Sequence, residues 1–413
     1  MHSSSTPAPQ LGRAFSDGTL GLVALAILLA SAVVWSSHSV NAERTDFALT
    51  YVGAHIVHEG SGRQLYDLGL QVRLRESMFQ HASPLYFEHP PFEALALSRL
   101  AGFSFRTAYL VWGLVNVAVL LVLIVWLQPY FSWPAEDLGY ISLWLLFAPL
   151  GVSLYQGQSS IFVLAAYAFA FVQLKKENPL SAGIALGLAL VKFQFAVPFA
   201  VIFLLRRQWR FLGGFAASAA VLGLFSIVAV GWGGVLDYIR LLLRIGNNPQ
   251  NLSYGSAVDM PTLHGLVYAA AGHHLNVVGL NTVVSLLTLA LLVWIAWRWK
   301  AEPQTRSFDL MFAAAVAASL LAGSHMFTHD FSPLVLGMFL AGVNLRALSR
   351  RIRATLVFTL VVFWAFPLYF LFVNWHCLYL MAIILITFVW ACVRAAKRIA
   401  QSSGVGVHMV AAG

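Results

Sequence analysis

The sequence predicts an all-α membrane protein that forms a single bundle of about 10–12 transmembrane or half-spanning helices. Hydrophobic residues make up 60% of the 413-residue chain and charged residues only 10%, against roughly 25% charged residues in soluble proteins. Apolar runs long enough to enter a bilayer recur along the whole chain. This composition excludes a cytosolic globular enzyme, a disordered protein and a nucleic-acid-binding protein.

The chain begins with a polar tail over residues 1–18, and the apolar run at 19–40 is long enough to be an uncleaved signal anchor. A polar stretch follows over 41–105, and connections of that length are usually functional. We interpret it as the first outer loop, in which helical periodicity predicts helices that lie on the membrane. These helices are expected at 46–58, 64–81 and 91–102.

The other apolar runs lie downstream of this loop. We expect membrane-embedded helices at 107–128, 139–155, 158–174, 180–205, 211–233, 275–297, 308–324, 331–345, 354–373 and 377–395. A polar interval at 234–274 is interpreted as a second large outer loop, with an amphipathic segment at 237–245. One transmembrane domain therefore covers 19–398, and a cytoplasmic tail follows over 399–413.

The run at 180–205 is unusual because basic clusters flank it on both sides, at 175–176 and 206–210. Both clusters belong on the inner face, yet two full crossings need about 40 residues. We therefore interpret the run as a re-entrant pair of half-helices, broken near Lys192 and Pro198. The alternative is a single crossing, which would invert the topology of everything downstream.

The distribution of charge predicts where the functional site lies. With the N-terminus inside, most of the 25 Lys and Arg residues fall on the inner face, and the short outer turns carry none of them. Most of the 13 histidines and 16 acidic residues fall on the outer face. Because titratable groups gather at functional sites, we expect an active site that faces the periplasm or the exterior.

Asp46 lies just after the first span, and Tyr51 and Leu65-Tyr66-Asp67 follow it. A carboxylate held at the bilayer edge between apolar helices suits a general base. The alternative is an N-cap, in which Asp46 only accepts backbone hydrogen bonds at the start of a helix. From spacing alone, the N-cap is the simpler interpretation.

The segment Glu88-His89-Pro90-Pro91 opens one of the expected loop helices. Prolines fix the chain there, and the first N–H groups of the helix point at whatever precedes it. A phosphate group could bind at this point beside His89. The alternative is a rigid turn with an exposed His89.

An outer turn with Gln156 and Gln158 joins two spans, and Lys192 and Gln194 lie at the tip of the expected hairpin. Polar groups at this depth must meet one another, a cavity or a charged ligand. A lipid phosphate and sugar hydroxyls would satisfy them, whereas helix-to-helix hydrogen bonding is the alternative for the glutamines. For Lys192 we favour function, because its own run contains no acidic residue.

The outer segment at 324–330 contains His325, His329 and Asp330, which can transfer protons, orient one another or bind a metal. The two histidines lie in a turn without a nearby cysteine, so the spacing does not favour a metal site. We expect neither a metal nor a cofactor. Asp259 and His264, in the second outer loop, are expected to line the same cleft.

In their order along the chain, these motifs resemble those of the GT-C glycosyltransferases, and most closely those of glycosyltransferase family 87. The resemblance covers residues 41–335 and rests on Asp46, Leu65-Tyr66-Asp67, His89-Pro90-Pro91, Gly157-Gln158-Ser159-Ser160, Pro179 to Gly183, Leu190 to Gln194, Arg206 to Arg210, Met260 to Leu266 and His325 to Asp330. The chain departs from the family pattern at Lys192-Phe193, where the family usually has Lys-Pro. Because the next proline is Pro198, the backbone break is expected to be displaced.

The resemblance implies a GT-C-like bundle that transfers a hexosyl group, mannosyl in bacterial members of the family, with inversion. The donor would be a polyprenyl-phosphate-linked sugar and the acceptor a lipid or a glycan, at the outer face of a bacterial inner membrane among membrane lipids. Asp46 matches the general base of the family. We expect the donor to be bound by His89, Gln156, Gln158, Lys192, Gln194, His325, His329 and Asp330. The acceptor cleft is expected to include Tyr51, Tyr66, Asp259 and His264.

Other classes of protein share this composition. A secondary transporter would show repeated halves and charged pairs midway through its spans, and the sequence shows neither pattern. A non-enzymatic scaffold would leave the outer histidines and acids without a role. A metal-dependent, peptide-directed glycosyltransferase is the closer chemical alternative, and it would lose activity with a chelator.

Overall fold

A computed structural model describes residues 11–81, 86–131, 138–247 and 257–410, and in these ranges all regular secondary structure is helical. The expected all-α membrane architecture is confirmed. Six helices of the described chain are long and apolar enough to cross a membrane. Residues 1–10 of the expected N-terminal tail and 411–413 of the C-terminal tail lie outside the described residues.

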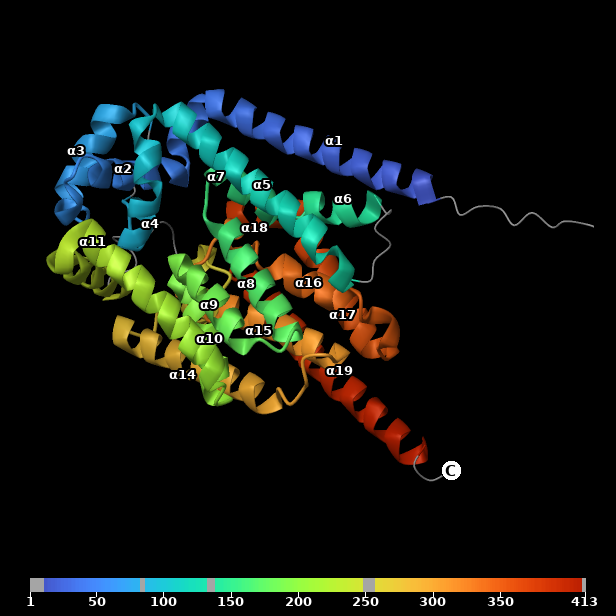
Figure 1. The fold of residues 1–413 in the computed structure, drawn as a ribbon. Helices are drawn as coiled ribbons and strands as arrows, with labels where there is room; N and C mark the ends of the chain where they lie inside the picture. Colours follow the sequence, from blue (N-terminus) through green and yellow to red (C-terminus); the bar gives the residue numbers. More distant parts are fainter. Residues whose placement is uncertain (1–10, 82–85, 132–137, 248–256, 411–413) are drawn as a thin grey trace, which may run out of the picture.

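Helices α1 and α5 lie along each other, and the helices of the first outer loop gather at one end of this pair (Figure 1). The first part of the chain forms α1 Leu11–His38, the 3₁₀ helix η1 Val40–Arg44, α2 Asp46–His58, η2 Gly62–Gln64, α3 Leu68–Met78, α4 Pro91–Leu97, η3 Ser98–Gly102, α5 Phe105–Phe131, α6 Leu138–Leu146, α7 Ala148–Gln156 and α8 Ser160–Lys175.

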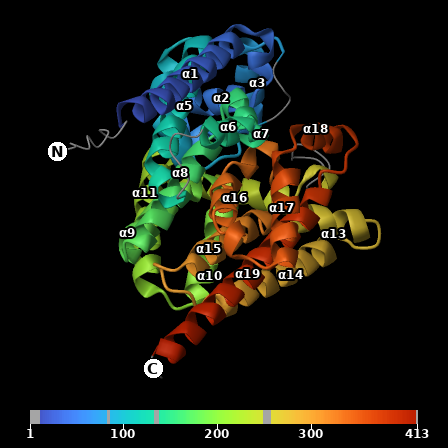
Figure 2. The ribbon, with the colours of Figure 1, turned by 90° about the vertical axis from the view of Figure 1, so that its right-hand side faces the viewer.

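The rest of the chain lies mostly below the outer-loop helices in Figure 2, although α18 is level with α7, and α19 leads to the C-terminus away from the outer-loop helices. Its elements are α9 Pro179–Leu188, η4 Ala189–Lys192, α10 Phe193–Leu205, α11 Trp209–Asn247, η5 Ala257–Asp259, α13 Leu263–Ala271, α14 Val277–Arg298, α15 Arg306–Leu321, η6 Thr328–Phe331, α16 Leu334–Gly342, η7 Leu345–Ala347, α17 Arg350–Trp364, α18 Phe366–Asn374 and α19 Leu380–Val410.

The first outer loop folds into a small helical unit with its own apolar core. Helix α2 is buried over most of its length and packs on α4 and η3. Gly53 allows this packing, because a Cβ at that position would lie 2.6 Å from the ring of Phe87. Asp67 caps α3 by accepting the N–H of Leu70 at 3.0 Å. The loop thus presents the start of α2 in a fixed position.

The hairpin interpretation of 180–205 agrees with the contacts at its two ends, although the segment is long enough to cross as one helix. Lys175, just before α9, forms an ion pair of 2.9 Å with Asp309 near the start of α15. Arg206, just after α10, donates to the carbonyl of Trp299 at 3.2 Å, also near the start of α15. Both ends of the segment therefore lie at the same end of α15.

The middle of the segment lies at the opposite end of α15. Lys192 pairs with Asp330, which follows α15 in the chain. The backbone of Lys192 leaves the helical region at φ −121° and ψ 68°, so the reversal occurs there. Pro198 lies inside α10, and the expected break near it is wrong. The chain doubles back through the 3₁₀ turn η4 without needing a proline.

Three other apolar runs differ from their expected form. The run at 139–155 is divided into α6 and α7, because Pro149 lies in the first turn of a new helix. The run at 354–373 forms α17 and α18, which are bent by 67°. The run at 211–233 continues through a kink at Gly231, whose φ is 71°, into the amphipathic segment at 237–245. Hydropathy alone therefore located these runs without their breaks.

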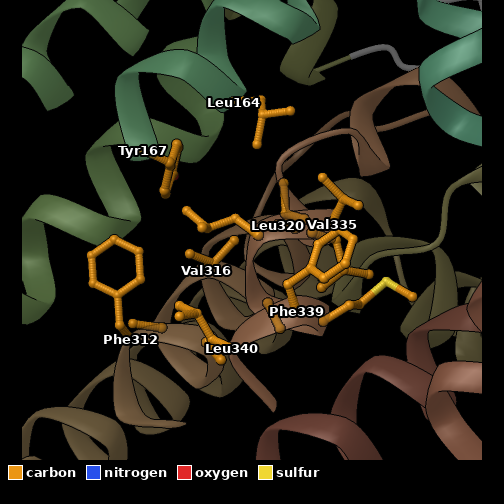
Figure 3. Packing of buried hydrophobic residues seen from close by; sticks show 14 of the residues in the cluster. Leu164, Tyr167, Phe312, Val316, Leu320, Val335, Phe339 and Leu340 are labelled. Atoms are coloured by element: carbon orange, nitrogen blue, oxygen red, sulfur yellow. The ribbon is translucent and has the colours of Figure 1, made fainter. Parts of the chain in front are cut away.

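The centre of the bundle is formed by α8, α15 and α16. Their side chains interdigitate in Figure 3, which labels Leu164, Tyr167, Phe312, Val316, Leu320, Val335, Phe339 and Leu340. Helix α15 also packs extensively on α19. Because α15 is buried on nearly all sides, the turn that follows it, at 322–333, is held rigidly at one end of the core.

Candidate active site

A cavity of about 1050 Å³ lies where the first outer loop meets the hairpin tip and the turn after α15. Most residues expected at the site line it, namely Asp46, His89, Gln156, Gln158, Lys192, Gln194, Asp259, His264, His325, His329 and Asp330. Tyr51 and Tyr66 were also expected in the cleft, but they do not line this cavity. Tyr51 donates its hydroxyl to the carbonyl of Phe103 at 2.7 Å, and Tyr66 donates to the carbonyl of His89 at 2.7 Å.

Asp46 is held by the two glutamines of the outer turn. Its carboxylate accepts a hydrogen bond of 2.7 Å from Nε2 of Gln158, and its backbone N–H donates to Oε1 of Gln156 at 3.1 Å. About a quarter of its side chain, 26%, remains exposed. The N-cap of α2 is Thr45, so the interpretation of Asp46 as a cap is wrong.

The turn that carries these glutamines is fixed by its neighbours. Gly157 adopts φ 64° and caps α7 in the left-handed region, where a side chain would be strained. A Cβ there would also lie 2.7 Å from that of Phe47, the residue after Asp46. Trp112 of α5 donates to the carbonyl of Gly157 at 2.8 Å. Only glycine therefore permits this turn to approach the start of α2.

The hairpin tip is tied to the turn after α15 by a buried ion pair. Nζ of Lys192 binds Oδ1 of Asp330, and these side chains are 6% and 1% exposed. Ser160 donates to the same carboxylate at 3.2 Å, and the N–H of Phe327 donates to its other oxygen at 3.0 Å. The run at 180–205 contains no acidic residue, and Lys192 therefore finds its acidic partner, Asp330, in another element.

His329 lies between two carboxylates. Its Nδ1 is 3.8 Å from Oδ2 of Asp46, and its Nε2 is 3.4 Å from Oδ2 of Asp330. Burial lowers the pKa of His329, and it lowers the pKa of His325 to about 4, against the opposing charge of Asp330. Both rings are therefore neutral at neutral pH and can act as N–H donors rather than as cations.

Burial raises the pKa of the Asp330 carboxyl, but His329, Lys192 and the hydrogen bonds of Lys192 and Phe327 more than offset that effect. The pKa of Asp330 is consequently below its usual range, and the group is ionised. An ionised and fully paired Asp330 has a positioning role in this arrangement, because it fixes Lys192 on one side and approaches His329 on the other.

His89 is bound by an acid of α4, the helix that follows it in the chain. Its Nδ1 lies 2.5 Å from Oε2 of Glu93. Burial lowers the pKa of His89, but the charge and the hydrogen bond of Glu93 raise it by more than burial lowers it. The net pKa of His89 is therefore above the usual value. Helix α4 has seven residues and an acid in its first turn. The negative charge of Glu93 makes the start of α4 a poor site for a phosphate. His89, which is paired with Glu93, is the basic side chain of this segment.

The cavity residues on α10, α11 and α14 are mainly apolar, and we call this part of the cavity the apolar arm, although α14 also contributes Asn281, Ser285 and Thr288. The apolar arm is lined by Val201, Leu242, Ile245, Val284, Leu289 and Leu292. It continues from the polar region around Asp46 and Lys192 within the same cavity. The site therefore combines a titratable end with an apolar end, as a ligand with a charged head and a long hydrocarbon chain would require.

The second outer loop and the end of α18 meet at another part of the cavity wall. Nδ1 of His376 lies 3.2 Å from both oxygens of Asp259. His264, in the first turn of α13, is 8% exposed, and burial lowers its pKa. Its Nε2 is buried without a hydrogen-bond partner. An unpaired buried nitrogen in a cavity wall is a group that a ligand can satisfy.

The sequence prediction did not include three cavity or near-cavity groups among its site residues. Glu88 and Tyr238 line the cavity, and Glu93 holds His89 from behind. Glu88 was detectable, because it directly precedes His89 in a polar motif. Tyr238 and Glu93 lie on helices and carry no local signal of their position.

The comparisons with known proteins identify the family of the chain. A family model described as glycosyltransferase family 87 matches residues 87–324, which is more than half of the chain. No curated protein and no solved structure matched the chain. The matched segment contains His89, both glutamines, Lys192 and His264. The chain belongs to glycosyltransferase family 87 and is a membrane glycosyltransferase of the GT-C type.

Proposed function

We propose that the protein transfers a hexosyl group, and specifically a mannosyl group, from a polyprenyl-phosphate donor to a hydroxyl of a lipid or glycan acceptor. The transfer inverts the anomeric carbon and takes place at the outer face of a bacterial plasma membrane. The observation that carries the proposal is that a partly exposed carboxylate, Asp46, shares one cavity with Lys192, His89 and the apolar arm. These are the groups that a base-catalysed transfer from a lipid phosphate requires.

The apolar arm supports a lipid-linked donor. A nucleotide sugar has no apolar part that would occupy the space between α10, α11 and α14. A polyprenyl chain would bury its hydrocarbon there and leave its phosphate near the polar end. Helix α14 is also one of the helices long enough to cross a membrane, so the arm borders the region where such a chain is dissolved.

Asp46 is the proposed general base. An acceptor hydroxyl is a weak nucleophile, so Asp46 takes its proton as the oxygen attacks the anomeric carbon. A new glycosidic bond forms while the bond from that carbon to the phosphate oxygen breaks, and the lipid phosphate leaves with the electron pair. Asp46 precedes the segment matched by the family model. Its proposed role therefore depends on its contacts with Gln158 and His329.

The leaving phosphate needs charge stabilisation but no proton. His89 is a cation over more of the pH range than an ordinary histidine, because Glu93 raises its pKa. Lys192 is paired with Asp330, and protonated His89 is paired with Glu93, so each contributes a fixed dipole rather than a free charge. The neutral rings of His325 and His329 supply N–H groups. The side chains of Lys192 and His329 are largely buried, and a charge interaction among buried groups is worth more than one in bulk water.

The proposed orientation follows from the end of the bundle opposite the cavity. Lys175 and Arg206 lie there, beside the start of α15. Arg398 of α19 donates to Ser349 just before α17, at the same side as the basic residues 350–353. Cytoplasmic ends of membrane helices carry the excess of Lys and Arg. This supports a cavity that opens to the periplasm or exterior.

The function can be tested with purified protein in lipid nanodiscs, given a panel of polyprenyl-phosphate hexoses, the corresponding nucleotide sugars and a membrane lipid extract. We expect a mannosylated product only with the polyprenyl donor. Asp46→Asn should lower turnover by about 10²- to 10⁴-fold while donor binding and Tm stay unchanged. Transfer from nucleotide sugars alone, or normal turnover by Asp46→Asn, would contradict the proposal.

A further inference from the structure

Glu88 is a second carboxyl group in the cavity, and its backbone is fixed on both sides. Before it, Gln71 accepts the N–H of Phe87 at 2.7 Å and donates to its carbonyl at 3.3 Å. After it, the carbonyl of His89 accepts the hydroxyl of Tyr66 at 2.7 Å. Phe87 anchors the segment because its ring is buried in the outer-loop core, and Glu88 lines the cavity. The chain therefore presents the Glu88 carboxyl to the cavity in a defined position.

This carboxyl lacks a protein partner. Among the residues that the structure describes, Glu88 makes no hydrogen bond or ion pair. The hydroxyl of Tyr238, which lines the same cavity from α11, is buried and is also without a hydrogen-bond partner. Buried polar groups are rarely left unpaired, because the loss of water is costly. Glu88 is partly exposed and lines the same cavity, so a ligand there can reach both groups, and a ligand with several hydroxyl groups would pair them.

The groups that face Glu88 come from different elements. They are Asp46 at the start of α2, His89 next in the chain, Lys192 at the hairpin tip and Tyr238 on α11. Burial raises the pKa of Glu88 to about 7, Asp46 adds to that rise, and His89 and Lys192 oppose it. Near neutral pH the carboxyl is therefore in part protonated. In that form it can donate one hydrogen bond and accept another.

We propose that Glu88 is a specificity-determining residue that binds a hydroxyl group of the sugar being transferred. This inference depends on the proposed function, and it assigns the recognition of the sugar ring to a residue other than the base. Glu88 interacts electrostatically with both Asp46 and Lys192. In the proposed transfer, the sugar ring lies between the base and the phosphate. A carboxyl that faces both of those groups is therefore beside the ring.

The test compares the activity of two variants with two kinds of donor. The donors are a polyprenyl-phosphate hexose and a set of its singly deoxygenated analogues, and the variants are Glu88→Ala and Glu88→Gln. The matched control is Glu76→Ala, whose side chain is 68% exposed and outside the cavity. With the hexose, Glu88→Ala should lower kcat/KM by about 10-fold or more, because a site built for a hydroxyl discriminates strongly. With one deoxy analogue it should cause no further loss.

Glu88→Gln should restore most of the activity, because an amide can donate and accept as the protonated acid does. The pH profile provides a second readout. Wild type should lose kcat/KM as pH rises through about 7, since ionised Glu88 cannot donate and repels the donor phosphate. In Glu88→Gln this decline should be smaller, because only the deprotonation of His89, whose pKa is also raised, remains to cause it. A decline as large as that of wild type would show that Glu88 is not the titrating group, and that result would overturn the proposal.

Two further outcomes would also overturn it. One is an equal loss with every donor, which would mean that no hydroxyl is recognised. The other is a change confined to the KM of the acceptor. Failure of the proposed function is distinguishable, because wild type itself would then transfer nothing from any polyprenyl donor. A Tm measurement on each variant separates loss of recognition from loss of folding, and Glu88→Gln keeps the test valid if Glu88→Ala unfolds.

Discussion

The side-chain amide of Gln158 donates to the carboxylate of Asp46 at 2.7 Å, although 112 positions separate the two residues. Nδ1 of His329 lies 3.8 Å from the oxygen that accepts this hydrogen bond, Oδ2. Three parts of the chain therefore meet at one oxygen atom: the first outer loop, the turn between α7 and α8, and the turn after α15. The position of the proposed base is determined by tertiary contacts rather than by its own helix.

Gln158→Leu tests whether the glutamine acts through Asp46. The substitution removes the donor that orients the carboxylate, and we expect kcat to fall about tenfold, as for a hydrogen bond to a charged group. The KM for the donor should change little, because Asp46 and not Gln158 contacts the reacting hydroxyl. Gln208→Leu, at an exposed position beside the opposite end of the bundle, should be neutral. A loss confined to donor KM would indicate that Gln158 binds the sugar directly.

The buried pair of Lys192 and Asp330 should show strong energetic coupling. Lys192→Met or Asp330→Asn alone leaves its former partner buried and unpaired, which costs about 3–5 kcal/mol. The double variant should be much less destabilised than the sum of the two. Equilibrium unfolding in one detergent would measure this coupling.

The pair Lys175 and Asp309 provides the control, because both side chains are 15% exposed, against 6% and 1% for Lys192 and Asp330, and water therefore screens them more. Its coupling should be smaller than that of Lys192 and Asp330. Additive losses at Lys192 and Asp330 would show that the two residues are not an ion pair.

Much of the fold could be predicted because hydropathy and charge report on membrane contact directly. The two basic clusters around 180–205 indicated the hairpin, and the helix at Asp46–His58 has the expected bounds. The breaks were harder to predict, because hydropathy does not report backbone angles. Pro149 was a visible signal for one break, whereas the kink at Gly231 depends on a positive φ that the sequence does not specify.

The site was predicted as a set of residues but not as a set of contacts. The predicted topology grouped the polar residues that lie at the outer face, and most of these residues line one cavity. Lys192 and Asp330 are 138 positions apart, and one sequence contains no information on which distant residues touch. Tyr51 and Tyr66 were expected in the cleft because they follow Asp46, but helical packing turns both hydroxyls toward backbone carbonyls.

The pair of His89 and Glu93 predicts a pH dependence of stability. The pKa of His89 is raised in the folded protein, so the stabilisation is fully present below the unfolded pKa of about 6.5. It is lost as pH rises through the folded pKa. The Tm of wild type should therefore approach that of His89→Gln as the pH rises above about 6.5. Glu93→Gln should flatten the profile in the same way, and a constant difference between wild type and His89→Gln would exclude the pair as its cause.

The apolar arm predicts a dependence on the length of the donor lipid. Val284 lines the arm from α14, whereas Leu286 is 61% exposed on another side of that helix and does not line the cavity. Val284→Trp would fill the arm with a large ring, so kcat/KM for a long-chain polyprenyl donor should fall about tenfold. A donor analogue with a short chain should be used as well as by wild type, because its chain does not reach the substituted position. Leu286→Trp should leave both donors unaffected, since its ring extends toward lipid. If Val284→Trp impaired the short and long donors equally, the arm would not be where the polyprenyl chain binds.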